Sequence, residues 1–365
     1  MIAGELRHWL RLTLVPGVGG EGRRQLLKTF GLPDAIFAAP PTALRGAIGA
    51  DAADRLLAHD CENEILQALD WASQTGNRIV TLADPDYPRA LLNTVDPPVL
   101  FYVKGRTELL NRPAIAVVGS RNASKQGESD AEAFSRTLAD AGLTVVSGMA
   151  LGIDGAAHRA ALNGTGSTIA VVGTGADRIY PAGNENLARA VAERGVLISE
   201  FPLGTPPLAA NFPRRNRLIA GLSRGCLVIE AAERSGSLIT ARLAAELGLE
   251  VFALPGSIHS PLSKGCHKLI KQGAKLVESA QDVLEELRWE AIVAPAAGVD
   301  RRPDDPVALR LLDNLGYNPC DLDTLTSRIG LTTDQVLALL LPLELDGYVT
   351  QLPGGRYQRI PQRLA

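Results

Sequence analysis

Short apolar segments that alternate with stretches of helical period are the feature of this chain that most constrains its fold. They fill the region from Arg78 to about Trp289. The predicted strands are 115–118, 144–147, 169–172, 196–199, 226–230 and 251–254, and the clearest predicted helices are 129–140, 153–162, 186–194 and 238–247. Strands that are apolar on both faces, each followed by a helix, are typical of a parallel sheet covered on both sides. The sequence therefore predicts a doubly wound α/β sheet.

Two smaller regions flank this α/β pattern. Residues 1–75 contain short helical stretches around the turn Pro16-Gly17-Val18-Gly19, which predict a small helical domain. Residues 291–305 have no apolar period and are interpreted as a linker. Residues 306–365 contain three helical stretches and a hairpin signal at Pro353-Gly354-Gly355, which together predict a winged helix. The α/β region between the first domain and the linker spans residues 76–290.

The charge balance limits the ligands that the chain can bind. Its 365 residues include 37 Lys and Arg against 40 Asp and Glu, for a formal net charge of -3. This balance excludes a globally basic nucleic-acid binder, so a polyanion site must come from local clustering. The four cysteines lie far apart with no C-x-x-C pair, which argues against a zinc site and a disulfide framework. We expect neither a metal nor a cofactor.

Membrane and secretion signals are also missing from the sequence pattern. No uninterrupted apolar run approaches the roughly 20 residues that a bilayer crossing needs. The first residues, Met1 to Glu5, lack the basic start and the apolar stretch of a secretion signal. We therefore expect a cytoplasmic protein without a membrane partner.

Small residues follow five of the predicted strands. In an open parallel sheet, ligands bind beyond the carboxyl ends of the strands, where backbone N–H groups are free. The five ends are Gly119-Ser120-Arg121, Gly148-Met149-Ala150, Gly173-Thr174-Gly175, Ser235-Gly236-Ser237 and Pro255-Gly256-Ser257. One such glycine more often marks a tight turn, but recurrence at five ends favours a phosphate-binding groove. Neither G-x-G-x-x-G nor a P-loop motif is present, which argues against a dinucleotide cofactor and a P-loop ATPase.

A cluster of arginines lies in the segment Phe212-Pro213-Arg214-Arg215-Asn216-Arg217, and Arg224 follows it. No acidic residue occurs between Phe201 and Glu230. Helical spacing places Arg217 and Arg224 on one face, with Arg214 and Arg215 near the helix start beside Phe212. Guanidinium groups grip phosphates and stack on bases, so binding is favoured over a merely solvated face. We expect this cluster to contact a nucleic-acid backbone.

Lysines and possible catalytic pairs give weaker signals. Lys264, Lys268, Lys271 and Lys275 have helical spacing, and the stripe either tracks phosphates or is an exposed helix face. Asp154 and His158 lie four residues apart, but no third metal ligand is evident. A capping and orienting role is favoured for this pair. Glu230 and Glu233 are interpreted as loop-anchoring or dimer-contact residues.

Several of these motifs, taken in order, resemble the DprA/Smf family of DNA-processing proteins. They are Gly119-Ser120-Arg121, residues 147–154, residues 212–219, residues 236–241 and Pro255-Gly256-Ser257. The resemblance implies an extended Rossmann fold, preceded by a SAM- or helix-hairpin-helix-like domain and followed by a winged helix. It implies a homodimeric protein, not an enzyme, that binds single-stranded DNA. It also implies that the protein protects incoming strands and loads the RecA recombinase on them during natural transformation.

The resemblance further implies roles for individual residues. Gly119, Ser120 and Arg121 form the first phosphate-binding turn, and Arg214 and Arg217 contact the strand. The other expected DNA-binding residues are Gly148, Met149, Gly173, Thr174, Phe212, Arg215, Asn216, Gly236, Ser237 and, more weakly, Lys264. The Pro16–Gly19 turn is similar to a helix-hairpin-helix, which either holds a phosphate or packs two helices.

The main alternative is a nucleotide phosphoribohydrolase of the lysine-decarboxylase-like group, which has a related fold. Its phosphate loop resembles P-G-G-x-G-T-x-x-E, whereas residues 235–241 here contain no carboxylate for proton transfer. A pure scaffold is the third class, and the acid-free arginine segment argues against it. The predicted recognition helix of the winged helix, 333–345, has no Arg or Lys and only Gln335 as an amide, so we expect it to serve protein contacts rather than base reading.

Overall fold

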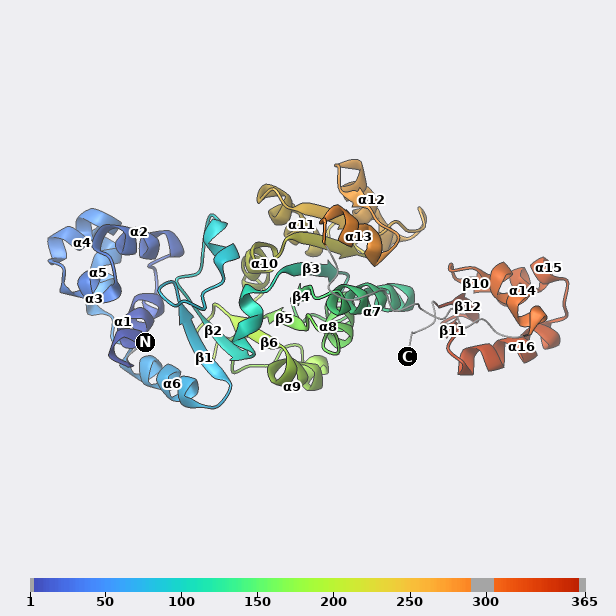
Figure 1. Ribbon diagram of the computed structural model, residues 1–365, viewed down its shortest axis with the longest axis horizontal. Helices are drawn as coiled ribbons and strands as arrows, with labels where there is room; N and C mark the ends of the chain where they lie inside the picture. The colour runs from blue at the N-terminus through green and yellow to red at the C-terminus, as the bar shows by residue number, and fades with distance from the viewer. Residues whose placement is uncertain (1–2, 290–304, 361–365) are drawn as a thin grey trace.

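The chain folds into a helical region, a central α/β body and a small carboxy-terminal body, which lie in a row in Figure 1. The computed structural model describes residues 3–289 and 305–360. The helices of the first region are α1 (Ala3–Leu14), α2 (Gly20–Phe30), α3 (Pro33–Ala38), α4 (Pro41–Ile48), α5 (Ala50–Ala58) and α6 (Glu62–Ser73). Proline at the first position of α3 and α4 suits a helix start, because that position needs no N–H donor.

The helical region and the central body share a core. Trp9 and Leu26 of the helices belong to the same buried cluster as Tyr102, Ala170 and Leu197 of the sheet. The helical region therefore packs directly on one face of the sheet.

Nine strands of the described residues form one mixed sheet in the order β1-β2-β6-β5-β4-β3-β7-β8-β9. They are β1 (Asn77–Thr81), β2 (Leu100–Gly105), β3 (Ala114–Gly119), β4 (Thr144–Ser147), β5 (Thr168–Val171), β6 (Val196–Ser199), β7 (Gly225–Ile229), β8 (Glu250–Ala253) and β9 (Lys275–Leu276). β3 to β9 pair in parallel, with Ala116 opposite Cys226 in the central pair, and this confirms the predicted α/β fold.

The two strands at one edge were not predicted from the sequence. β1 pairs antiparallel with β2, and β2 pairs antiparallel with β6, so the sheet is mixed rather than wholly parallel. An antiparallel pair needs no helix between its strands. Residues 77–81 and 100–105 therefore lack the alternation of strands with helices that predicts the other strands.

Helices cover both faces of the parallel part of the sheet. They are α7 (Lys125–Asp140), α8 (Ile153–Ala161), α9 (Glu185–Arg194), α10 (Asn211–Gly221), α11 (Ser237–Glu246), α12 (Lys264–Lys271) and α13 (Ala280–Glu286), with short 3₁₀ turns η1 (Arg89–Asn93), η2 (Thr107–Asn111), η3 (Ala182–Asn184) and η4 (Pro261–Ser263). Alternate residues of β3 point to opposite faces. Ile115 and Val117 pack with α7 and α8, whereas Ala116 and Val118 pack with α10 and α11.

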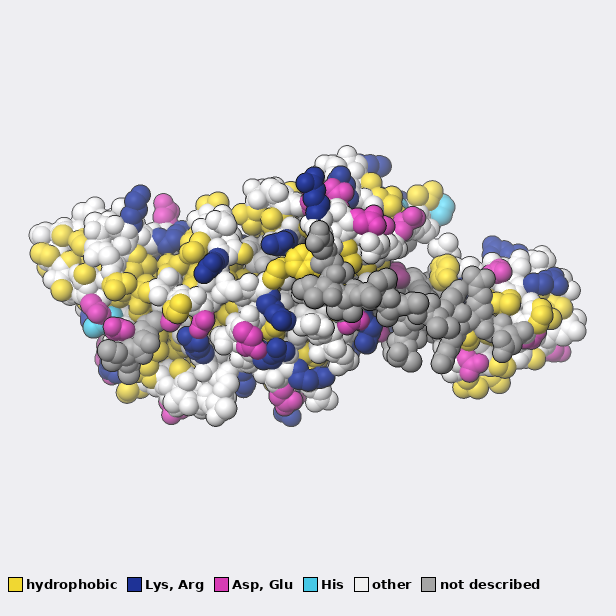
Figure 2. Space-filling view, in the orientation of Figure 1, with side chains coloured by type: hydrophobic (Ala, Val, Ile, Leu, Met, Phe, Trp, Pro, Cys, Tyr) yellow, Lys and Arg dark blue, Asp and Glu magenta, His cyan; other side chains and the backbone are white. Residues whose placement is uncertain are grey.

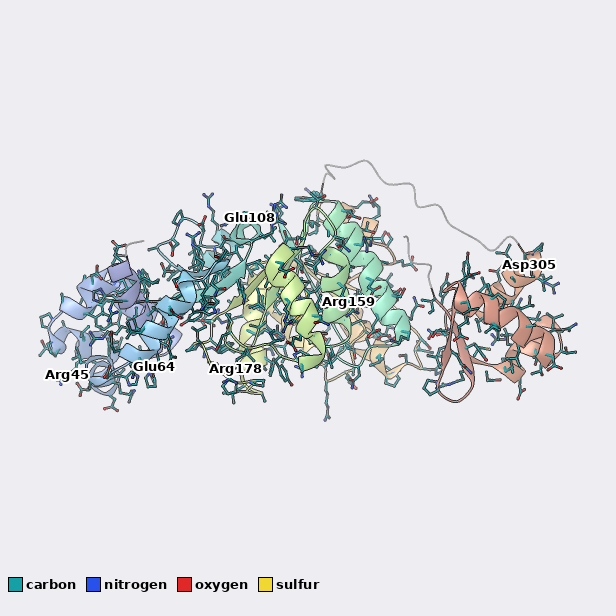
Figure 3. All side chains as sticks on the ribbon, turned by 90° about the horizontal axis from the view of Figure 1, so that it is seen from below. Arg45, Glu64, Glu108, Arg159, Arg178 and Asp305 are labelled. Atoms are coloured by element: carbon teal, nitrogen blue, oxygen red, sulfur yellow. The ribbon has the colours of Figure 1, made fainter. Side chains whose placement is uncertain are left out.

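The carboxy-terminal body is a winged helix. Its elements are α14 (Pro306–Leu315), β10 (Cys320–Asp321), α15 (Leu322–Ile329), α16 (Thr333–Leu345), β11 (Val349–Leu352) and β12 (Arg356–Arg359), and its sheet has the order β10-β12-β11. Leu311, Leu325 and Leu340, one from each helix, meet in a core of its own. Asp305, labelled in Figure 3, lies at the start of this body, on the side of the α/β body away from the helical region.

Candidate nucleic-acid interface

A cavity of about 470 Å³ opens at the carboxyl edge of β3, β4 and β7, where α10 and α11 begin. We call it the groove. The structure brings these expected DNA-binding residues together in its lining: Gly119, Ser120, Arg121, Phe212, Arg215, Asn216, Gly236 and Ser237. The expected residues outside its lining are Gly148, Met149, Gly173, Thr174, Arg214, Arg217 and Lys264. The first, second and fourth glycine-bearing strand ends thus surround one cavity, as expected for a parallel sheet.

A stack of side chains stands at the rim of the groove. The guanidinium carbon of Arg121 lies 5.4 Å from the centre of the Phe212 ring, and the Tyr180 ring centre lies 5.6 Å from that of Phe212. Gly173 lies under this stack, because a Cβ there would come within 3.0 Å of the Phe212 ring. The exposed Tyr180 ring and the half-buried Phe212 ring beside an exposed arginine form a surface on which nucleic-acid bases can stack.

Tyr180 was missed by sequence reasoning. It lies between β5 and α9, in a segment with no motif, and is 44% exposed. The only sequence signal was an aromatic residue in a loop of a chain with few aromatics. Its contact with Phe212 joins residues about thirty positions apart and depends on the fold.

Polar donors line the sides of the groove. The Ser120 hydroxyl accepts a hydrogen bond from the Asn122 N–H at 3.2 Å, and the Ser235 and Ser237 hydroxyls lie 2.7 Å apart. Gly236, between these serines, faces open space, since a Cβ there would have no atom within 4 Å. The backbone at Gly236 is therefore accessible to a ligand.

Gly119 is a glycine for a different reason. A Cβ at this position would lie 1.9 Å from the Ile229 carbonyl oxygen on β7, so a larger residue would push the two strands apart. The sequence motif thus combines a packing requirement at Gly119 with an exposed cation at Arg121.

Arg215 forms a buried positive floor beneath the groove. It is 4% exposed and donates to the Val171 carbonyl, while its Nε has no hydrogen-bond partner. Burial lowers the pKa of Arg215 to about 10, so the guanidinium still carries its charge at neutral pH. Its side chain lies against Gly148, where a Cβ would clash with it. Arg215 is therefore not the freely exposed contact that the sequence predicted at the helix start.

Asp154 and His158 are buried and form hydrogen bonds to the backbone of a neighbouring loop. Asp154 accepts the Gly148 and Ala150 N–H groups at 3.2 and 3.3 Å, and burial raises its pKa while the charge of Arg215 opposes that shift. Burial also lowers the pKa of His158 to about 3. The neutral imidazole accepts the Met149 N–H at Nε2, and its Nδ1 lies 2.7 Å from the Thr168 hydroxyl. The two side chains hold the loop after β4.

Arg217 corrects the expectation of an arginine cluster without acids. Its side chain is 15% exposed and forms ion pairs with Glu200 and Asp96. Arg214 is half exposed, with its Nε 3.9 Å from Glu200 and its guanidinium 5.6 Å from the Phe201 ring. The segment contains no acid in sequence, but the end of β6 and the η1–β2 loop supply acids in space.

The predicted common face of Arg217 and Arg224 is also wrong. α10 ends at Gly221, and the Arg224 N–H donates to the Ala114 carbonyl at the start of β3. Arg224 therefore lies at the amino ends of the strands, whereas the groove lies at their carboxyl ends.

Three other expected residues differ in accessibility. Met149 and Thr174 are 1% exposed, so their side chains cannot meet a ligand without rearrangement. The Lys264 ammonium is exposed and donates to the Ile258 carbonyl at 2.5 Å. The predicted lysine stripe is interrupted, because α12 ends at Lys271 and Lys275 belongs to β9.

Glu230 anchors a loop, as one of the two interpretations proposed. Its carboxylate accepts the Ser124 N–H at 2.8 Å and the Ser124 hydroxyl, which ties the start of α7 to the end of β7. Figure 2 shows Lys and Arg side chains spread over the visible face with Asp and Glu among them. The accessible cation at the groove is thus a local feature, as the near-neutral charge requires.

The recognition helix of the winged helix offers little to a base edge. Its only amide, Gln335, is used in a capping box, where its side chain accepts the Thr332 N–H at 3.0 Å. Leu337, Leu341 and Leu345 are exposed along the same helix. In the described residues, no group of acids, histidines and cysteines could hold a metal, and no helix there has the length and apolarity to span a membrane.

Comparison with known proteins identifies the family. Residues 78–288 match the family described as DNA recombination-mediator protein A, and residues 295–355 match the DprA winged helix domain. The chain belongs to this family. Protein Smf of Escherichia coli is 46% identical over 298 residues, covering 80% of each chain.

Two solved structures of family members are similar to this chain. DNA processing protein A from Streptococcus pneumoniae has a TM-score of 0.69 and 39% identity, over 77% of this chain and 97% of that one. DNA processing protein A from Helicobacter pylori, solved to describe its single-stranded DNA binding mode, has a TM-score of 0.53 and 32% identity, over 57% of this chain and 95% of that one.

The family assignment decides between the alternatives raised by the sequence. The predicted resemblance to DprA/Smf proteins is confirmed, as are the Rossmann-like body and the winged helix. The family is one of DNA recombination mediators rather than of enzymes, which removes the phosphoribohydrolase alternative.

Proposed function

We propose that this protein binds single-stranded DNA in the groove. The observation that carries the proposal is the stack of Arg121, Phe212 and Tyr180 at the rim, directly beside exposed backbone at Gly236. Such a surface binds phosphates through the guanidinium and bases through the rings. It supports binding of unpaired strands, since only unstacked bases have free faces. A family relative described by its single-stranded DNA binding mode adds support.

The proposal assigns direct contacts to a subset of the expected residues. Arg121, Phe212, Asn216, Gly236 and Ser237 face the strand in this scheme. Ser120 and Gly119 shape the first turn, Arg215 adds positive potential from below, and Gly173 and Gly148 seat the side chains. Arg214 and Lys264 are assigned peripheral contacts, and Arg217, Met149 and Thr174 support the loops. We also propose that the chain divides into domains at residues 1–75, 76–290 and 306–365, with 291–305 as a linker.

We further infer that the protein protects incoming single strands and loads the RecA recombinase on them in natural transformation. The family description as a recombination mediator supports this role. It requires that the protein works in the cytoplasm, and we propose that it does so as a homodimer through the Rossmann-like body. The sheet edge at β9, where Leu276 is 51% exposed, is available for such a contact.

The binding proposal is tested by comparing three ligands: a single-stranded oligonucleotide, its duplex and a mononucleotide. We expect clear preference for the single strand, and affinity that falls steeply with salt because phosphate contacts release counterions. Fluorescence anisotropy across a salt series measures both. Equal affinity for duplex and single strand, or a flat salt response, would contradict the proposal.

The mediator role needs a separate test. RecA filament growth on a strand already coated with single-stranded DNA-binding protein is expected to start faster when this protein is present. Arg121→Ala is expected to lose that effect in parallel with DNA affinity. Unchanged filament growth would contradict RecA loading.

The proposed dimer is tested by light scattering coupled to size exclusion, which measures the mass of the protein in solution. A monomer at all concentrations would contradict the dimer.

A further inference from the structure

A second cavity lies at the opposite edge of the sheet, where β3 and β7 begin. It has a volume of about 430 Å³, and we call it the basal cavity. Its lining includes Arg89, Arg112 and Arg224, with Pro113 and Leu222 among its apolar walls, and contains no acidic residue. Three guanidinium groups around one cavity without a carboxylate give it a strong local positive charge.

The acids nearest in sequence form their ion pairs with other arginines, although the charge of Arg112 also acts on Glu108. Asp86 pairs with Arg78 at 2.5 Å, and Glu108 pairs with Arg106 at 2.8 Å. Within residues 3–289 and 305–360, none of the three basal arginines forms an ion pair. This contrasts with Arg217, which meets two acids. The charge of the basal cavity is therefore available to an anion from outside.

Backbone contacts bring the three arginines together from distant parts of the sequence. The Asn111 side chain accepts the Arg89 N–H at 3.0 Å and so joins η1 to η2 beside Arg112. The Arg224 N–H donates to the Ala114 carbonyl at 2.8 Å, which fixes the start of β7 next to the start of β3. These contacts fix the backbone before any ligand arrives.

The side chains keep donors for a ligand. Arg112 donates one N–H to the Thr165 carbonyl at 2.8 Å, and Arg224 lies over the Trp289 ring at 5.6 Å. A guanidinium carries five N–H donors, so these neutral contacts orient the groups without using all of their donors. Planar forks of this kind bind phosphate oxygens in pairs.

We propose that the basal cavity is a second binding site for the phosphodiester backbone of single-stranded DNA. In this inference, which rests on the proposed function of the groove, a strand bound in the groove continues over the body and its phosphates reach Arg89, Arg112 and Arg224. Three guanidinium groups around one cavity can hold the phosphates of a flexible polymer, each through paired N–H donors.

The two sites are close enough for one strand to occupy both. β3 runs from Ala114 at the basal cavity to Gly119 at the groove, about 17 Å at 3.3 Å per residue. α10 runs from Phe212 at the groove towards Leu222 at the basal cavity, about 15 Å at 1.5 Å per residue. The straight-line separation of the two sites is therefore roughly 15–17 Å, a distance that a strand of several nucleotides can span.

The test replaces the three basal arginines together, Arg89→Gln, Arg112→Gln and Arg224→Gln, and measures affinity for a short and a long oligonucleotide. The short one fills the groove only, and its affinity is expected to stay at the wild-type level. For the long one, the slope of log affinity against log salt is expected to become shallower by about 2, since each lost contact contributes about 0.7 on single strands.

A matched control has the same change in charge elsewhere. Arg7→Gln, Arg45→Gln and Arg189→Gln remove three surface arginines that pair with acids away from the basal cavity. If the basal variant binds the long oligonucleotide with the same affinity and salt slope as this control, the inference is overturned. If the wild type fails to bind even the short oligonucleotide, the proposed function of the groove fails instead.

A labelling experiment locates the strand directly and does not depend on the stability of the triple variant. The native cysteines are all buried, so Ala90→Cys in the basal lining provides a selectively labelled thiol. A photocrosslinker there is expected to capture the long oligonucleotide and not the short one. Absence of crosslinks to the long oligonucleotide, while it is bound in the groove, would also overturn the inference.

Discussion

The rim of the groove and the interior near the end of β6 both hold arginines, but in opposite surroundings. At the rim, Arg121 is exposed and has no carboxylate partner among the described residues. In the interior, Arg217 is largely buried between Glu200 and Asp96. Removing one partner of a buried pair destabilises the fold, whereas an exposed unpaired cation contributes little until a ligand arrives. The comparison distinguishes an arginine that supports the fold, Arg217, from an arginine that can bind a ligand, Arg121.

The largest expected effect is on the interior side of this comparison. Arg217→Ala removes the ion-pair partner of Glu200, whose side chain is only 11% exposed. Breaking a buried pair from one side typically costs about 3–5 kcal/mol, and we expect a loss near the lower end because Arg214 is also close. Urea unfolding followed by circular dichroism measures it.

The control for this variant is an exposed pair. Arg189→Ala breaks a surface pair with Glu185 on α9 and is expected to cost less than about 1 kcal/mol. If Arg217→Ala is as stable as Arg189→Ala but has lost single-stranded DNA binding, Arg217 belongs to the rim in function, and the comparison fails.

The next effect is on the rim side. Arg121→Ala is expected to reduce affinity for single strands by about 10- to 100-fold, equivalent to one charged hydrogen-bonded contact of about 1.5–3 kcal/mol. The loss should be the same for all sequences, because phosphate contacts carry no base information. Anisotropy titrations with several oligonucleotides measure affinity, and the urea midpoint should stay unchanged.

Arg45→Ala in the helical region is the control for Arg121→Ala. It removes the same charge from a surface pair with Asp54, far from the groove in sequence. Equal affinities of the two variants would show that Arg121 acts only through net charge and would remove it from the site.

The α/β sheet and the position of the groove followed from sequence for a physical reason. Strands that are buried on both faces have a distinctive composition, and the carboxyl ends of parallel strands must meet at one edge. Gly119 and Gly236 could therefore be placed together from their positions in the pattern. The antiparallel strands β1 and β2 could not, because they lack the alternation with helices that revealed the others.

The arginines show where sequence reasoning stops. The interval between Phe201 and Glu230 contains no acid, yet Glu200 and Asp96 approach Arg217 from one residue before that interval and from a distant loop. The absence of acids from a stretch of sequence does not show that the folded chain places no acid beside that stretch. Tyr180 was missed for the same reason, since its contact with Phe212 exists only after α10 and the loop after β5 come together.

A smaller effect tests whether the rim also uses its aromatic rings. Tyr180→Ala is expected to weaken single-strand binding by about 1 kcal/mol, the lower end for loss of one stacked base. Tyr180→Phe keeps the ring and is expected to bind like the wild type. If both variants lose affinity equally, the hydroxyl rather than the ring makes the contact, and the stacking argument is wrong.

The smallest expected effect concerns Gln335, a polar side chain whose hydrogen bond caps the start of its own helix, α16. Gln335→Ala removes half of the capping box of α16 and is expected to cost the winged helix about 0.5–1 kcal/mol without changing DNA affinity. Differential scanning calorimetry and anisotropy measure the two quantities on one sample. A base-reading residue would give the reverse, with lost sequence preference and unchanged stability. Because Gln335 already accepts the Thr332 N–H, we expect lower stability with unchanged DNA affinity. The exposed leucines of α16 would then serve contacts with a protein.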